Sequence, residues 1–215
     1  MSEPTYHYHN SPSSPPPPSP LPATLTLTTP RNTDIWRKPP TTDDFTGPIL
    51  YRTIPLSALK SARVTIRANW TTQFDQGGLI LAIDPPPADD TTGKSAKQWV
   101  KTGIEFFEGQ ARVSTVACDR WSDWSLVSLS EGEASATIEL EREVTPDGSK
   151  TSTLWVYVRR GEVRQPLREV AWMWEADVTG GADKEAWIGL YAARPNKEVE
   201  GDLDVEFEGF EVESF

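Results

Sequence analysis

The sequence predicts an all-β domain, a sandwich of two antiparallel sheets, behind a disordered N-terminal tail. Short segments in which apolar and polar residues alternate recur along the chain, with turn residues about every eight to twelve positions. No window of helix length shows a helical period. Nine tryptophans and a hydrophobic fraction of 37% supply the apolar surface of a core. We therefore expect about twelve to fourteen strands, in one domain over residues 23–215.

Residues 1–22 form the predicted tail. They are rich in Ser and Pro, include four consecutive prolines from Pro15 to Pro18, and carry one charged residue, Glu3. This composition cannot bury a core and favours extended polyproline II conformations. Two interpretations stay open: a passive tail, or a ligand for a proline-binding module.

The first half of the domain begins with Leu25 and Leu27, which alternate with threonines as in a strand. A second strand is predicted over residues 49–54. In residues 62–70 the apolar positions alternate with outward Arg, Thr and Asn, and Gly77-Gly78 precedes a strand over 79–83. A Pro/Asp-rich loop over residues 84–96 then interrupts the strands.

The second half begins with a hairpin, Trp99–Phe107 and Gln110–Cys118, around the turn Glu108-Gly109. Further strands are predicted over 126–129, 137–142 and 153–159. Residues 186–193 are apolar on both faces, as in a central strand. Leu203, Val205 and Phe207 alternate in a last strand, whose phase changes at Gly209 as at a bulge.

Composition excludes several classes of protein. The net charge is −11, so we expect neither nucleic acid nor an anionic membrane as a partner. No apolar run is long enough to span a bilayer, and no signal peptide is recognisable. Cys118 is the only cysteine, so no disulfide can form within the chain. Together these features predict a cytoplasmic protein.

Histidine occurs only in the tail, at His7 and His9. The domain therefore lacks the base of a Ser-His-Asp or Cys-His mechanism, and a His-rich metal site has no ligands. We expect no cofactor. Asp84, Asp89 and Asp90 are a candidate cation site in the Pro/Asp-rich loop, although a solvated loop is the default interpretation.

The most informative strand is residues 99–105. Alternation places Trp99, Lys101 and Glu105 on one face, and Val100 and Ile104 on the other. The second face suits a core. The first combines an aromatic platform, a cation and a carboxylate, which suits a polar ligand such as a sugar.

Three motifs in fixed order resemble a known family. They are Asp75-Gln76-Gly77-Gly78-Leu79, Trp99-Val100-Lys101-Thr102-Gly103-Ile104-Glu105 and Ser122-Asp123-Trp124-Ser125. Trp36 and the closing Phe207-Glu208-Gly209-Phe210 also fit. The chain looks like the "regulation of enolase" domain family of the concanavalin A-like lectin/glucanase superfamily. The resemblance implies a jelly-roll sandwich with one concave face, which holds or cleaves sugars in the wider superfamily. The family is mostly of unknown biochemical function, and its name suggests a link to sugar metabolism in fungi.

A ligand-binding site on that face is predicted from polar and aromatic side chains of three strands and the third motif. The candidate residues are Gln76, Trp99, Lys101, Glu105, Asp123, Trp124 and Arg159. The alternative is a structural polar network in which the aspartates cap turns and Lys101 and Glu105 lie on a solvated face. Lys101 and Glu105 are roughly 13 Å apart along the strand, so they interact only through a neighbouring strand.

Hydrolysis would need two carboxyl groups about 5 Å or about 6.5–9.5 Å apart. Asp204, Glu206 and Glu208 share one strand face, but the inward Val205 and Phe207 explain them as solvated. Glu105 with Asp75 or Asp123 is the better pair. We assign no catalytic residue and no metal ligand. Cys118 is predicted to be a small buried residue and not a reactive thiol.

Three functions stay open on these observations. The first is a non-catalytic module that binds a carbohydrate or another small polar ligand, with a regulatory role in sugar metabolism. The second is a protein-interaction or regulatory protein that acts through the sheet edge or the Pro-rich tail. The third is a carboxylate-dependent glycoside hydrolase or lyase.

Overall fold

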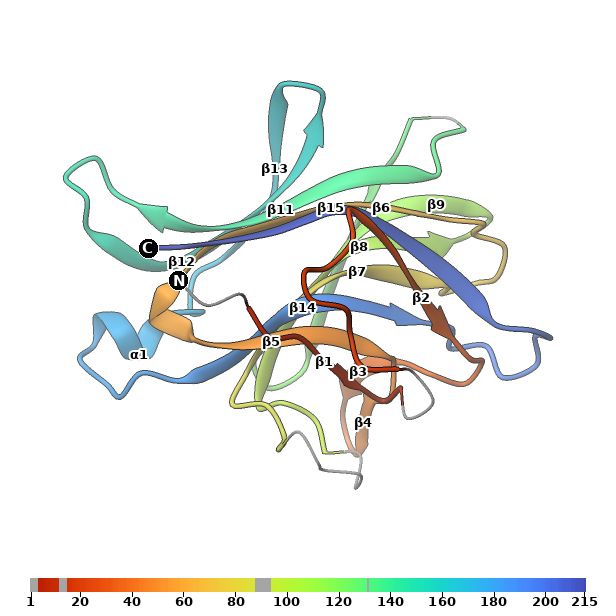
Figure 1. Ribbon diagram of the computed structural model, residues 1–215, viewed down its shortest axis with the longest axis horizontal. Coiled ribbons are helices and arrows are strands. Elements are labelled where there is room, and N and C mark those ends of the chain that lie inside the picture. The colour runs from red at the N-terminus through yellow and green to blue at the C-terminus, as the bar shows by residue number, and fades with distance from the viewer. Residues whose placement is uncertain (1–3, 12–14, 88–93, 131) are drawn as a thin grey trace.

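The computed structural model describes residues 4–11, 15–87, 94–130 and 132–215, and two antiparallel sheets dominate it (Figure 1). The larger sheet has the order β1 (His7–His9), β5 (Ile49–Pro55), β14 (Glu185–Ala193), β7 (Gln76–Ile83), β8 (Gln98–Phe107), β9 (Gln110–Cys118) and β10 (Ser122–Ser128). The smaller has the order β13 (Val163–Val170), β12 (Lys150–Arg160), β11 (Ser135–Val144), β6 (Leu59–Ala68), β15 (Leu203–Ser214) and β2 (Thr24–Thr29). The described helices are a 3-10 turn, Leu56–Ala58, and α1 (Glu175–Val178). The predicted all-β sandwich is confirmed.

The main core lies between the two sheets, and the alternation seen in the sequence positions it. Val64 and Ile66 of β6 are fully buried there, as are Val205 and Phe207 of β15. Gly209 has a φ of +64°, and the pairing of β15 with β6 shifts register between Glu208 and Glu211. The predicted bulge is therefore present. Strand β14 is buried along almost all its length, as expected of a central strand.

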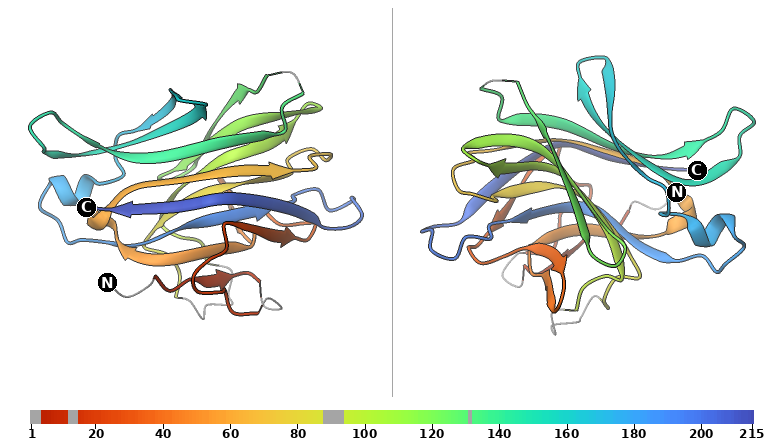
Figure 2. Two further views of the ribbon diagram at one scale, coloured as in Figure 1. Left: turned by 45° about the horizontal axis from the view of Figure 1, so that its top comes forward. Right: turned by 180° about the vertical axis from the view of Figure 1, so that it is seen from behind.

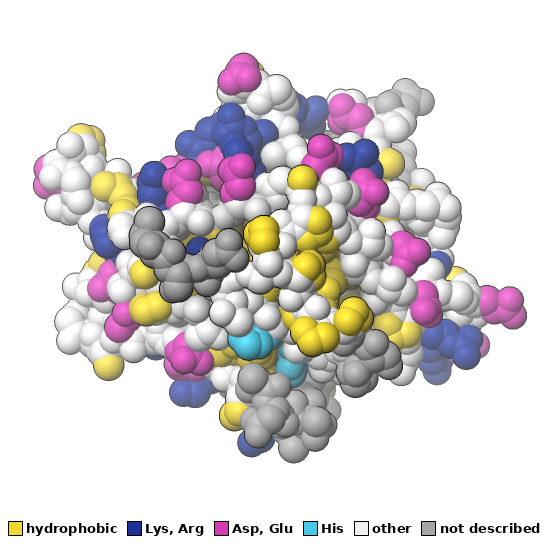
Figure 3. All heavy atoms as spheres, in the orientation of Figure 1, with side chains coloured by type: hydrophobic (Ala, Val, Ile, Leu, Met, Phe, Trp, Pro, Cys, Tyr) yellow, Lys and Arg dark blue, Asp and Glu magenta, His cyan; other side chains and the backbone are white. Residues whose placement is uncertain are grey.

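The outer face of the smaller sheet is a ladder of opposite charges. Arg67 pairs with both Glu206 and Glu208, and Arg63 pairs with Glu211 at 2.7 Å. Figure 3 shows basic and acidic side chains mixed along this side of the molecule, at the top of the view. These half-exposed pairs occupy the outward positions of β6 and β15, so they account for the polar half of each strand's alternation.

A second apolar cluster lies on the opposite face of the larger sheet, because a hairpin covers part of that face. The hairpin consists of β3 (Ile35–Lys38) and β4 (Thr42–Phe45). Its Ile35 and Phe45 pack with Ile80, Trp99 and Trp187 of the sheet. Figure 2 shows the smaller sheet and this hairpin on opposite sides of the larger sheet. The hairpin therefore covers part of the face that the sequence predicts to bind a ligand, and only the rest of that face is open.

Part of the N-terminal segment departs from the predicted disordered tail. Residues 7–9 form β1, which pairs with the edge strand β5. The Asn10 amide donates hydrogen bonds to the carbonyls of Phe45 and Gly47 at 2.7 and 3.1 Å, and His9 packs on Trp187. These residues precede the proline run, so their N–H groups are available for pairing. Residues 15–22 contain no helix or strand.

The candidate cation site lies partly outside the described residues, which do not include Asp89 and Asp90. Asp84 pairs with Lys97 at 3.3 Å. Within the described ranges, no group of three or more His, Cys, Asp or Glu side chains is arranged to hold a metal ion. No helix in those ranges is both long and apolar enough to cross a membrane.

Candidate functional site

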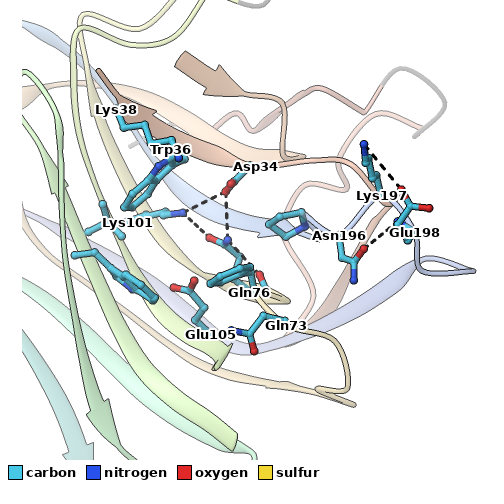
Figure 4. A pocket seen from close by; sticks show the side chains of 14 residues that line it. Asp34, Trp36, Lys38, Gln73, Gln76, Lys101, Glu105, Asn196, Lys197 and Glu198 are labelled. Carbon is cyan, nitrogen blue, oxygen red and sulfur yellow. Dashed lines mark hydrogen bonds and ion pairs between the residues drawn. The ribbon is translucent and has the colours of Figure 1, made fainter. Parts of the chain in front are cut away.

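A cavity of about 630 Å³ opens beside the β3–β4 hairpin, on the face of the larger sheet that points away from the smaller sheet. Val100 and Ile104 of β8 pack into the main core, so alternation turns Lys101 and Glu105 toward the cavity. Figure 4 shows these two side chains with Gln76, below β3 and beside the loop that carries Asn196. The volume falls within the roughly 300–1,000 Å³ typical of small-ligand pockets.

Two paired glycines hollow the floor of the cavity. Gly78 of β7 lies opposite Gly103 of β8, between the pair Gln76–Glu105 and the pair Ile80–Lys101. A Cβ added to Gly103 would lie 2.0 Å from the carbonyl oxygen of Gly77, so no side chain fits. The row between these two pairs is therefore empty of side chains, and this lets Lys101 reach back along the sheet toward Gln76.

Lys101 is the centre of a buried polar network. Its side chain is 3% exposed, and Nζ donates to Gln76 Oε1 at 2.5 Å and lies 3.7 Å from Asp34 Oδ1. Gln76 Nε2 donates in turn to Asp34 Oδ1 at 3.3 Å and to the Phe74 carbonyl at 3.2 Å. The Lys101 ammonium also lies 5.7 Å from the ring centre of Tyr191. The Asp34 carboxylate and these acceptors offset the cost of burying the lysine charge.

Glu105 forms a second chain of hydrogen bonds. Ser114 Oγ donates to Glu105 Oε2 at 2.7 Å, and Trp124 Nε1 donates to Ser114 Oγ at 3.0 Å. Burial raises the pKa of the Glu105 carboxyl, while the Lys101 charge and the bond from Ser114 act in the opposite direction. The chain fixes one carboxylate oxygen and orients the Trp124 ring at the cavity wall.

Aromatic rings form the remaining wall. The rings of Trp36 on β3 and Trp124 on β10 meet edge to face with their centres 6.2 Å apart. Phe74 approaches Trp124 in the same way at 6.3 Å, and it is 37% exposed. Phe74 has a φ of +71°, which a non-glycine residue adopts only where its surroundings hold it. Its N–H donates to the Phe106 carbonyl at 2.7 Å, which fixes the turn that presents the ring.

A buried ion pair supports two cavity segments from below. Asp75 is fully buried and precedes Gln76, whereas Arg194 precedes the cavity loop at residues 195–198. Arg194 Nε lies 3.4 Å from Asp75 Oδ1, and its guanidinium donates to Thr72 Oγ1 and to the Asp202 carbonyl at 2.9 and 2.8 Å. Burial raises the pKa of Asp75 although Arg194 opposes that change. The pair ties the Phe74–Gln76 turn to the opposite rim.

The cavity brings together four of the seven residues that the sequence nominated. Gln76, Lys101, Glu105 and Trp124 all line it. This placement also answers how Lys101 and Glu105 interact across a strand. Gln76 on the neighbouring strand lies opposite Glu105 in register and accepts the Lys101 hydrogen bond.

The structure corrects the placement of the other three. Trp99 shares the face of Lys101, but it is 0% exposed because the β3–β4 hairpin covers it. Asp123 precedes Trp124 and so points to the other side of β10, where it pairs with Arg168 at 2.5 Å. Arg159 belongs to the smaller sheet and pairs with Glu139 at 3.1 Å.

Sequence reasoning missed the contribution of residues outside the larger sheet. Asp34, Trp36, Phe74 and Asn196 line the cavity, yet none of them lies on a strand of that sheet. The sequence indicates Trp36 only through the family resemblance. The segment Asp34-Ile35-Trp36 does show a pattern that could have indicated this: an apolar residue stands between an acidic and an aromatic residue. Its direction toward β8 depends on long-range packing of Ile35.

The carboxylate pairs considered for hydrolysis are not assembled in the cavity. Asp204, Glu206 and Glu208 lie on the outer face of β15, where Arg67 pairs with two of them. Asp75 is buried against Arg194 and Asp123 lies at the sheet edge, so neither stands opposite Glu105 across the cavity. The acidic side chains that line it are Asp34, Glu105 and Glu198.

Two fungal proteins are similar to this chain in sequence. An uncharacterized protein of Emericella nidulans is 46% identical over 185 residues, which are 86% of this chain and 83% of that protein. Regulation of enolase protein 1 of Saccharomyces cerevisiae is 31% identical over 100 residues, 45% of this chain and 43% of that protein. The second match confirms the resemblance that the three motifs indicated.

Solved structures share the sandwich. A functionally unknown protein from Saccharomyces cerevisiae has a TM-score of 0.73 at 21% identity, covering 98% of this chain and 97% of that one. A GH43 protein from Bacillus licheniformis has a TM-score of 0.59 at 14% identity, and the match covers 90% of this chain but 33% of that longer one. The sequence profile of one family matches residues 15–215. The chain therefore belongs to the family described as "Protein of unknown function (DUF1349)".

Proposed function

We propose that this chain is a non-catalytic binding module whose cavity holds a carbohydrate. The observation that carries the proposal is the pairing of an aromatic wall, Trp36 and Trp124, with the buried polar groups of Lys101 and Glu105 in one cavity. Sugars present C–H faces that stack on aromatic rings and hydroxyls that hydrogen-bond to carboxylates and amines. The cavity combines both kinds of contact on a rigid sheet.

The preformed network supports binding as the role of the site. Gln76 and Ser114 hold Lys101 and Glu105 in place before any ligand arrives, which lowers the ordering cost of binding. The fold shared with a GH43 protein supports sandwich architecture alone. The name of the yeast relative supports a regulatory role in sugar metabolism as part of the same proposal.

Titration of the full chain with neutral mono- and disaccharides tests the proposal, with intrinsic Trp fluorescence and calorimetry as readouts. Reducing ends are assayed in the same samples. Glu105→Ala removes a hydrogen bond to a charged group, worth about 1.5–3 kcal/mol, so we expect affinity to fall about 10- to 150-fold. Glu206→Ala is the matched control, because Glu206 lies on the smaller sheet and pairs with Arg67.

Saturable binding that is lost in Glu105→Ala, kept in Glu206→Ala and unaccompanied by new reducing ends supports the binding module. New reducing ends that disappear in Glu105→Ala replace it with a glycoside hydrolase. The absence of binding across the whole panel overturns the proposal.

A further inference from the structure

At the floor of the cavity, the side-chain donors of Gln76 and Ser114 are used within the protein. Gln76 uses its amide oxygen for Lys101 and its two amide hydrogens for Asp34 and the Phe74 carbonyl. Ser114 donates to Glu105 and accepts from Trp124. These two residues hold the others in place and have little capacity left for a ligand.

Two carboxylates each have one oxygen that takes no part in the interactions described above. Glu105 accepts the Ser114 bond through Oε2, and Asp34 accepts the backbone N–H of Ile35, the Gln76 amide and the Lys101 ion pair through Oδ1. Neither Glu105 Oε1 nor Asp34 Oδ2 accepts any of these hydrogen bonds. Both residues line the cavity, and Asp34 is 27% exposed there.

The buried cation is not a free receptor for an anion. The Lys101 charge lies against Asp34, is hydrogen-bonded to Gln76, and faces the rings of Trp99 and Tyr191 at 5.9 and 5.7 Å. At the floor of the cavity, two carboxyl groups, those of Asp34 and Glu105, therefore accompany this one cation. The other lysines that line the cavity are Lys38 and Lys197. Both are exposed at its rim, and Lys197 pairs with Glu198 at 3.9 Å.

We infer that the cavity selects an uncharged polyhydroxyl ring, whose hydroxyls donate to Glu105 and Asp34, and rejects the same ring bearing a carboxylate or a phosphate. This inference rests on the proposed function and specifies the ligand class of the same site. An anionic substituent beside two carboxylates leaves like charges close together in a partly desolvated space, which is how binding sites exclude near-identical ligands. We expect the anionic ring to bind at least about tenfold more weakly than the neutral ring.

The test uses one ring in three charge states. Glucose, mannose and galactose are titrated into the full chain, each beside its uronic acid and its 6-phosphate, by calorimetry at constant ionic strength. The inference requires the neutral ring to bind at least about tenfold more tightly than both acids. Glu105→Gln and Asp34→Asn each replace a carboxylate acceptor by an amide that also donates. Each variant is therefore expected to lower severalfold the ratio of the affinity for the neutral ring to the affinity for the anionic ring.

Glu206→Gln is the matched control and leaves the ratio unchanged. A uronic acid or phosphate that binds as tightly as its neutral ring overturns the inference, while the proposed binding function stands. A ratio that neither Glu105→Gln nor Asp34→Asn alters also overturns it, because the selectivity then arises elsewhere. If no ring binds in any charge state, the proposed function fails together with the inference.

Discussion

The buried pair of Asp75 and Arg194 gives the sharpest prediction for stability. Asp75 is 0% exposed and Arg194 is 6% exposed, so removing either charge leaves the other in a low-dielectric interior. Arg194→Met deprives Asp75 of its counter-charge, and breaking a buried pair in this way costs about 3–5 kcal/mol. Asp75→Asn is expected to cost less. Arg194 keeps its bonds to Thr72 and to the Asp202 carbonyl, and the amide oxygen that replaces the carboxylate can still accept from the Thr72 N–H.

Urea denaturation at pH 7, followed by Trp fluorescence, measures both variants. Arg63→Met is the matched control, since it breaks a half-exposed pair with Glu211 and is expected to stay within about 1 kcal/mol of wild type. The cost of Arg194→Met is also expected to shrink at acid pH. Protonation of Asp75 removes the uncompensated charge, and the pKa of this carboxyl is already raised by burial.

A loss no larger than that of Arg63→Met would refute the reasoning, because it would mean that water reaches Asp75. The same pair ties the Phe74–Gln76 turn to the 195–198 rim. We therefore expect Arg194→Met to weaken the proposed sugar binding as well, with native fluorescence retained in the absence of urea.

Three further predictions concern Glu105 and Gly103 on the floor of the cavity and Cys118 in the second apolar cluster. Burial raises the folded-state pKa of Glu105 above its unfolded value of about 4.3, so the ionised form costs stability that the protonated form does not. Wild type should therefore lose stability relative to Glu105→Gln as pH rises from about 4 through the folded pKa; a difference that is constant between pH 4 and pH 8 in urea titrations contradicts this. Gly103→Ala should lower the free energy of unfolding by more than about 3 kcal/mol, because the added Cβ meets the Gly77 carbonyl. Gly148→Ala is the control: Gly148 has a φ of +87° and open space around its Cβ, so the loss should be about 1 kcal/mol. Equal losses of stability in urea denaturation would be inconsistent with a close-packed cavity floor. Cys118 is fully buried with a pKa raised by burial, so a thiol reagent should label it at least about 100-fold more slowly in the native chain than in urea; equally fast labelling in buffer would show that the second apolar cluster opens.

Four cavity residues could be predicted from the sequence, two of them because strand alternation is a local property. Lys101 and Glu105 share a face by period two, and hydrophobic partners at Val100 and Ile104 fix which face that is. Gln76 and Trp124 were predicted from the motifs of the family resemblance, and only the structure separates Trp124, which lines the cavity, from its neighbour Asp123. Local spacing could not show that Gln76, one strand away, is the acceptor that links Lys101 to the Glu105 end of the floor.

Four features could be predicted without the structure: the all-β class, the inward residues of β6 and β15, the bulge at Gly209 and the polar face of β8. Each of these follows from local periodicity or from a conformation that only glycine adopts readily. Tertiary structure alone decided which part of that face is open. The β3–β4 hairpin packs Ile35 and Phe45 over Trp99 and buries it, and it carries Asp34 and Trp36 to the cavity beside Lys101. That packing brings together segments that are far apart in the sequence. Burial of apolar surface is non-directional, so a contact of this kind produces no periodic pattern in the local sequence.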